Sequence, residues 1–116
     1  MTVIQVIWAL ICVVTISAGQ LLFKQAGVEI QEAGGWLTWR VVLIVGAAAV
    51  IYGLATLLWI NLLRDIALNK AYLFMALSFV IVPVASHFVF HEPLTTGFLI
   101  GGALMVAGLF IATRFG

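Results

Sequence analysis

Four long apolar runs leave this chain few ways to fold. A helix needs about 20 apolar residues to cross the hydrocarbon of a bilayer, and backbone amides in lipid must find hydrogen-bond partners within the protein. The runs are continuous rather than alternating, so they favour helices over the strands of a membrane barrel. We therefore predict an all-α integral membrane protein, a four-transmembrane-helix bundle with spans at about 3–23, 41–63, 71–90 and 94–113.

The composition points the same way. The chain is 66% apolar and only 8% charged, whereas about a quarter of the residues of a soluble domain are charged. The spans take up nearly all of the length, so we expect residues 1–116 to form a single membrane domain. The first run lacks the basic start and the small-residue cleavage site of a signal peptide, and we read it as a retained span.

The charges between the runs predict an orientation. Arg64, Lys70 and Arg114 fall on the side that holds both termini, and Lys24 and Arg40 fall on the other. Basic residues are enriched on the cytoplasmic side of membrane proteins. We therefore expect both termini in the cytoplasm. The difference between the two sides is a single residue, so insertion in both orientations, as an antiparallel dimer, remains an alternative.

Two prolines mark positions where a helix should change. Pro83 lies inside the third run, where it removes a backbone hydrogen bond and is expected to bend the helix or leave a local gap. Pro93 suits the first turn of the fourth helix, and Glu92 just before it would face the positive end of the helix dipole.

No group of residues predicts catalysis. His87 and His91 are four apart and Glu92 adjoins the second, but no further strong ligand lies nearby in sequence, so we expect no metal. A nucleophile with its base, a phosphate-binding glycine loop and a basic patch for nucleic acid are all missing from the sequence. We predict that the chain is not an enzyme, has no cofactor and binds no nucleic acid.

Polar residues at the ends of the spans form the candidate binding site. A polar group within a membrane is energetically unfavourable and is by default a functional candidate. Gln20 and Lys24 lie one turn apart on the same face of the first helix. The predicted substrate-binding residues are Gln20, Lys24, Arg40 and His87 near one membrane face, and Arg64 and Tyr72 near the other. The structural alternatives are a lysine that reaches the interface as an anchor, an interhelical hydrogen bond from Gln20, and a solvated rim.

Small residues recur at close spacing in the fourth run. They are Gly97, Gly101, Ala103, Ala107 and Gly108. Small side chains let helix backbones approach closely in lipid. One small bundle encloses little volume, and many transporters pair two similar halves. We therefore predict a homodimer, or a heterodimer with a similar four-helix subunit, although packing within one chain would use the same pattern.

Four motifs together resemble a known family. "SAGQLLFKQAG", "AYLFMALSFV", "FHEPLT" and "GGALMVAGLFI" are similar to segments of the four-helix branch of the drug/metabolite transporter superfamily, which includes EamA-like and small multidrug resistance proteins. The closest likeness is to the paired subunits of the Arn-type flippase. The resemblance implies a flippase subunit of the bacterial inner membrane that moves aminoarabinose linked to undecaprenyl phosphate, in lipopolysaccharide modification. It also implies that Lys, Arg and polar residues hold the phosphate.

The chain departs from the small multidrug resistance exporters at two positions. Their essential glutamate lies eight residues before the lysine that ends helix one, where this chain has Ile16. Met75 replaces the aromatic residue that helps to hold their cations. These departures favour a substrate that carries its own negative charge. An exporter of cationic compounds and a membrane assembly subunit without transport activity remain the alternatives.

Overall fold

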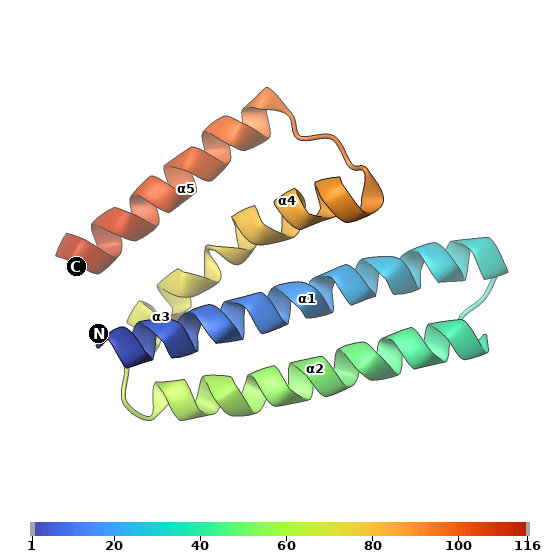
Figure 1. Cartoon of the computed structure of the whole chain (residues 1–116), viewed down its shortest axis with the longest axis horizontal. Coiled ribbons are helices and arrows are strands. Elements are labelled where there is room, and N and C mark those ends of the chain that lie inside the picture. Colours follow the sequence, from blue (N-terminus) through green and yellow to red (C-terminus); the bar gives the residue numbers. More distant parts are fainter. Residues whose placement is uncertain (1, 116) are drawn as a thin grey trace.

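The computed structural model describes residues 2–115, which form helices joined by short connections (Figure 1). The helices are α1 (Val3–Ala33), α2 (Trp39–Leu63), α3 (Leu68–Met75), α4 (Ser78–Phe90) and α5 (Thr96–Phe115). α3 and α4 share one span, so the described part of the chain has four helical segments long and apolar enough to cross a membrane. The all-α, four-span fold predicted from the sequence is confirmed. Both termini lie at one end of the molecule, and the 34–38 and 91–95 connections lie at the other (Figure 1).

α1 is longer than expected. It was predicted to end at Phe23, but residues 24–33 continue the helix to Ala33. Its 31 residues extend about 46 Å, so its C-terminal part projects beyond the roughly 30 Å of hydrocarbon. Lys, Gln and Glu form helices well, so their presence does not predict a loop. The stop signal is Gly34, which has a φ of 76° and donates its N–H to the Ile30 carbonyl at 2.9 Å.

α1 and α2 pack against each other as a long antiparallel pair (Figure 1). Buried positions repeat every seven residues in both helices, at Cys12, Gly19 and Ala26 in α1 and at Val41, Ala48, Ala55 and Leu62 in α2. Such a repeat keeps two helices in contact along their length at a shallow crossing angle. Most of these residues are small, which lets the backbones approach closely in lipid. This pair makes the most extensive helix–helix contact in the described part of the chain.

The third span is interrupted before its proline. The break lies at residues 76–77, between α3 and α4. Backbone N–H groups there donate to carbonyls three residues back, as Leu77 does to Phe74 at 3.1 Å, and this tightens the helix locally. Pro83 itself lies inside α4. The span is therefore interrupted about two turns before the proline, and not at Pro83, where the gap was expected.

The prediction that Pro93 occupies the first turn of the last helix is wrong. α5 begins at Thr96, and Pro93 lies in the 91–95 connection. Thr95 caps the helix instead, because its Oγ1 accepts a hydrogen bond from the Phe98 N–H at 3.1 Å. Glu92 is therefore separated from the start of α5, and its carboxylate does not interact with the positive end of the α5 helix dipole.

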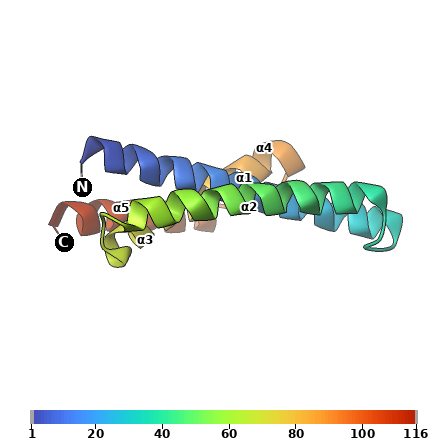
Figure 2. The same cartoon turned by 90° about the horizontal axis from the view of Figure 1, so that it is seen from below.

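The helices form an open layer (Figures 1 and 2). The molecule measures 50 × 36 × 17 Å, and one helix with its side chains is already about 10–12 Å across. α5 contacts α3 and diverges from α1 and α2. Gly102 is the one buried residue among those of α5 that the structure describes. Lipid or another subunit must cover the remaining apolar surface.

Candidate functional site

Three hollows follow one another along α1 and form what we call the α1–α4 groove. The first, of about 200 Å³, lies between α1, α2 and α3 and is lined in part by Tyr52 and Trp59. The second, of about 380 Å³, lies between α1 and the α3–α4 break. The third, of about 460 Å³, lies between α1 and the end of α4 and reaches Lys24 and Glu92. Neighbouring hollows share lining residues, which are Ile16, Tyr72 and Met75 for the first pair and Gln20, Val82 and Pro83 for the second.

The groove is mainly apolar with a few polar groups, as ligand sites usually are. Three of its hydroxyl groups bond to backbone carbonyls three or four residues earlier in the chain. The Thr56, Ser78 and Ser86 hydroxyls donate to the carbonyls of Tyr52, Met75 and Pro83, respectively. Such local bonds satisfy the hydroxyl donor. The other polar side chains of the groove are Gln20, Lys24, Tyr52, Tyr72 and Glu92.

Tyr52 is a groove residue that the sequence analysis missed. Its hydroxyl accepts a hydrogen bond from Gln20 Nε2, which joins α2 to α1. Its ring stacks on Phe23 with 5.1 Å between the ring centroids and 17° between the planes. The ring also lies directly over Gly19, where an added Cβ would overlap it. The interhelical hydrogen bond considered for Gln20 is thus present. The only hint of this contact in the sequence was a glycine in the first span, Gly19, and a single tyrosine in the second span, Tyr52.

Ser17, by contrast, does not extend the polar groove. It is buried, with 3% of its surface exposed, and its hydroxyl donates to the Val13 carbonyl at 2.7 Å. The polar residues that α1 contributes to the groove are therefore Gln20 and Lys24.

His87 lies beside the groove and fixes the turn that follows α4. Its Nδ1 lies 2.6 Å from the Glu92 carbonyl oxygen, and because a carbonyl can only accept, Nδ1 is the donor. The Glu92 N–H in turn donates to the Ser86 carbonyl at 3.5 Å. His91 has a φ of 58°, a left-handed conformation that reverses the chain direction after the helix. These contacts hold Glu92 at the third hollow.

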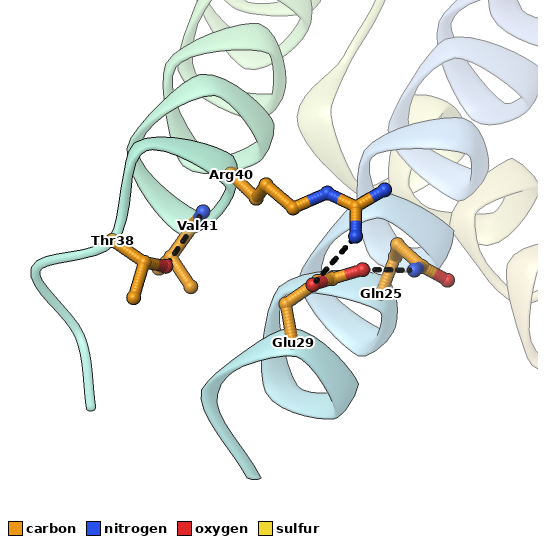
Figure 3. Close-up of polar contacts among 5 residues, drawn as sticks. All are labelled: Gln25, Glu29, Thr38, Arg40 and Val41. Carbon is orange, nitrogen blue, oxygen red and sulfur yellow. Dashed lines mark hydrogen bonds and ion pairs between the residues drawn. The ribbon is translucent and has the colours of Figure 1, made fainter. Parts of the chain in front are cut away.

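Arg40 is engaged elsewhere (Figure 3). Its Nη1 lies 3.9 Å from Glu29 Oε2, and Glu29 Oε1 accepts a hydrogen bond from Gln25 Nε2 at 3.3 Å. The Arg40 side chain is 64% exposed and that of Glu29 is 12% exposed, so only the arginine end of this 3.9 Å pair lies largely in solvent. Arg40 lines none of the three hollows. The structure therefore does not bring Arg40 together with Gln20 and Lys24.

The two residues predicted near the other membrane face are separated. Tyr72 lines the first two hollows. Arg64 lies at the end of α2 and donates from Nη1 to Asn61 Oδ1 at 3.3 Å, outside the three hollows. Of the six predicted residues, the groove thus gathers Gln20, Lys24 and Tyr72.

The small residues of α5 have almost no neighbours within the chain. A Cβ added at Gly101 or Gly108 would meet no atom within 4 Å, and one added at Gly97 would meet only Thr95 of the same segment. Ala103 and Ala107 are exposed. The glycine that packs within the chain is Gly102, against Val80 at 3.7 Å. The face of α5 that carries Gly97, Gly101 and Gly108 is therefore open to lipid or to another subunit.

Comparisons with known proteins place the chain in a family. No protein-family model matches it, and no solved structure matches it. A protein of Enterobacter sp. (strain 638) named "Probable 4-amino-4-deoxy-L-arabinose-phosphoundecaprenol flippase subunit ArnE" is 32% identical over 95 residues, covering 80% of this chain and 81% of that protein. A protein of Aeromonas hydrophila with the same name is 35% identical, covering 86% of this chain and 93% of that protein. An ArnF subunit of the same Enterobacter strain is 33% identical, covering 90% of each chain.

The two kinds of subunit match this chain about equally well. Both names describe a part of a membrane transporter, which agrees with the four apolar helices of a multi-pass membrane protein. The similarity extends over most of the chain and most of each relative. The resemblance noted from the sequence motifs is thereby confirmed, and the chain belongs to the family of the ArnE and ArnF flippase subunits.

Proposed function

We propose that this chain works with a partner subunit to move a polyprenyl-phosphate-linked sugar across the bacterial inner membrane, with both termini in the cytoplasm. The relatives are named for 4-amino-4-deoxy-L-arabinose-phosphoundecaprenol, a lipid of this class. The observation that carries the proposal is the α1–α4 groove, an apolar furrow with Lys24 at one end and Gln20 and Tyr72 along it.

An open groove suits a lipid substrate. The prenyl tail stays in the hydrocarbon, and the headgroup follows the polar side chains. A phosphate in hydrocarbon is strongly unfavourable unless a charge or hydrogen bonds compensate for its lost hydration. Lys24 supplies a mobile positive charge, and charge-assisted hydrogen bonds to phosphate are the strong ones. Gln20, Tyr52 and Tyr72 supply further hydrogen bonds on the way between the membrane faces.

The groove does not favour proton-coupled export of cations. Ile16 and Met75 line the first two hollows, where the related exporters carry a glutamate and an aromatic residue. Without a carboxylate at Ile16, a cation would have no counter-charge there and no group with which to exchange for protons.

The proposal is tested in lipid vesicles. The chain is reconstituted alone and with the subunit that co-purifies with it, and a polyprenyl-phosphate amino sugar is placed in one leaflet. A membrane-impermeant amine reagent then reports how fast the headgroup reaches the other leaflet. We expect acceleration over protein-free vesicles by at least one of the two preparations. Lack of acceleration by both would contradict the flippase role and favour an assembly subunit, and proton flux driven by cationic drugs would revive the exporter.

We also propose that the open glycine face of α5 contacts the partner subunit. Gly101→Leu fills the approach surface, and overpacking of a helix contact costs about 1–3 kcal/mol, or roughly a tenfold to hundredfold loss of association. Native mass spectrometry of the gently extracted complex measures that association. The matched control is Gly46→Leu in α2, whose Cβ position also has no atom within 4 Å. Equal association of both variants with the partner would exclude this face as the contact.

A further inference from the structure

The third hollow of the groove is lined by charges of opposite sign. Lys24 comes from α1 and Glu92 from the 91–95 connection, and both residues are exposed. The structure describes both side chains and shows no ion pair between them within 4.0 Å, whereas Arg40 and Glu29 do form one. Lys24 and Glu92 thus line one hollow of about 460 Å³ with no direct ion pair between them.

The position of Glu92 is fixed by the fold. The His87 ring donates to its carbonyl oxygen, and its own N–H donates to the Ser86 carbonyl. Glu92 also has no part in starting α5, which begins at Thr96. These contacts fix the Glu92 backbone, and within residues 2–115 its side chain has neither a helix-capping role nor an ion pair.

We propose that Lys24 and Glu92 together select a headgroup that carries both a phosphate and a protonated amine, with Lys24 binding the phosphate and Glu92 the amine. The inference rests on the proposed function and deepens it by making Glu92 a residue that determines substrate specificity. The volume of the hollow falls within the range of about 300–1,000 Å³ that is usual for ligand sites. The chemistry of the relatives' named substrate, an amino sugar joined to a phosphate, has this pair of charges.

The physical basis of the selection is charge matching. A headgroup with an amine offers each side chain an opposite charge, whereas a headgroup whose sugar is uncharged brings only its negative phosphate next to the Glu92 carboxylate. Selectivity often arises from such an unfavourable contact in the complex with the wrong ligand. A hydrogen bond to a charged group has a typical strength that corresponds to a preference of about tenfold to a hundredfold.

The test compares two lipids that differ only at the amine. Vesicles containing the chain and its co-purifying subunit receive either the polyprenyl-phosphate amino sugar or its N-acetylated form, each carrying the same fluorophore on the lipid tail. A membrane-impermeant quencher that binds the lipid phosphate reports how fast each of the two lipids reaches the other leaflet. We expect the natural sequence to move the amine-bearing lipid about tenfold to a hundredfold faster. Glu92→Gln should remove most of this preference by slowing the amine-bearing lipid, and Glu92→Asp should restore part of it.

The matched control is Glu32→Gln, which neutralises an exposed acid of α1 outside the three hollows and should keep the preference. The ratio of the two rates is the decisive readout, because a general loss of stability lowers both rates together. Equal rates for the two lipids with the natural sequence, or an unchanged ratio in Glu92→Gln, would overturn the inference and leave the flippase role intact. Movement of neither lipid by the natural sequence would refute the flippase role and the inference with it.

Discussion

Lys24→Gln is expected to slow headgroup translocation by about tenfold to a hundredfold, with the protein still inserted in the membrane. Lys24 supplies the positive charge of the α1–α4 groove, and glutamine keeps a polar side chain of similar reach without that charge. A hydrogen bond between charged groups contributes about 1.5–3 kcal/mol, which corresponds to the expected change in rate. The measurement is the leaflet-exchange assay, with the amount of inserted protein determined in the same vesicles.

Arg40→Gln is the matched control for this experiment. It removes a basic side chain from the same end of the molecule, but one that faces Glu29 and lies outside the hollows. Translocation should stay within about twofold of the natural sequence, because Arg40 lines none of the three hollows through which the headgroup is proposed to move. If both variants slow transport equally, the translocation rate depends on the total surface charge at that membrane face and not on a charge inside the groove. If Lys24→Gln transports normally, the lysine is an interfacial anchor and the phosphate site lies elsewhere.

Gly19→Ala is expected to destabilise the α1–α2 pair by about 1–3 kcal/mol, despite the higher helix propensity of alanine. A Cβ at this position overlaps the ring of Tyr52. The ring cannot move without loss of its stacking on Phe23 and of its hydrogen bond with Gln20. Unfolding by sodium dodecyl sulfate in mixed micelles measures the change in stability.

Gly27→Ala provides the comparison within the same helix. Its Cβ would meet no atom within 4 Å, so the substitution should leave stability unchanged or raise it by about 0.5–1 kcal/mol. Opposite signs for the two glycines would confirm that the close approach of α1 and α2 occurs at Gly19. Equal stabilisation by both would show that the Tyr52 ring does not lie over Gly19 in the membrane.

The candidate site could be predicted only in part. Gln20, Lys24 and Tyr72 were identified because polar groups near apolar spans are rare and stand out in a sequence. Tyr52 was missed, since a tyrosine within a span looks like ordinary packing until its neighbour in another helix is known. Arg40 was expected beside Lys24 from topology alone, but its side chain turns to Glu29 on a part of α1 that was expected to be a loop.

The sequence by itself determined the class of the protein. Continuous apolar runs must become helices in lipid, because each backbone amide there needs a partner close by in the chain, and this requirement is local. The absence of a carboxylate deep within a span was equally readable and set the expected charge of the substrate. Motif resemblance then pointed to the family that the relatives confirm.

Only the tertiary structure decided which faces of the helices meet. Lipid tails are as apolar as leucine side chains, so hydrophobicity does not mark the surface that packs against a neighbouring helix. The seven-residue repeat of small residues in α1 and α2 was present in the sequence, but its partner became clear only when the two helices lay side by side. Glu92 likewise became a groove residue only through the turn that His87 holds after α4, because a turn brings together groups whose separation no local pattern specifies.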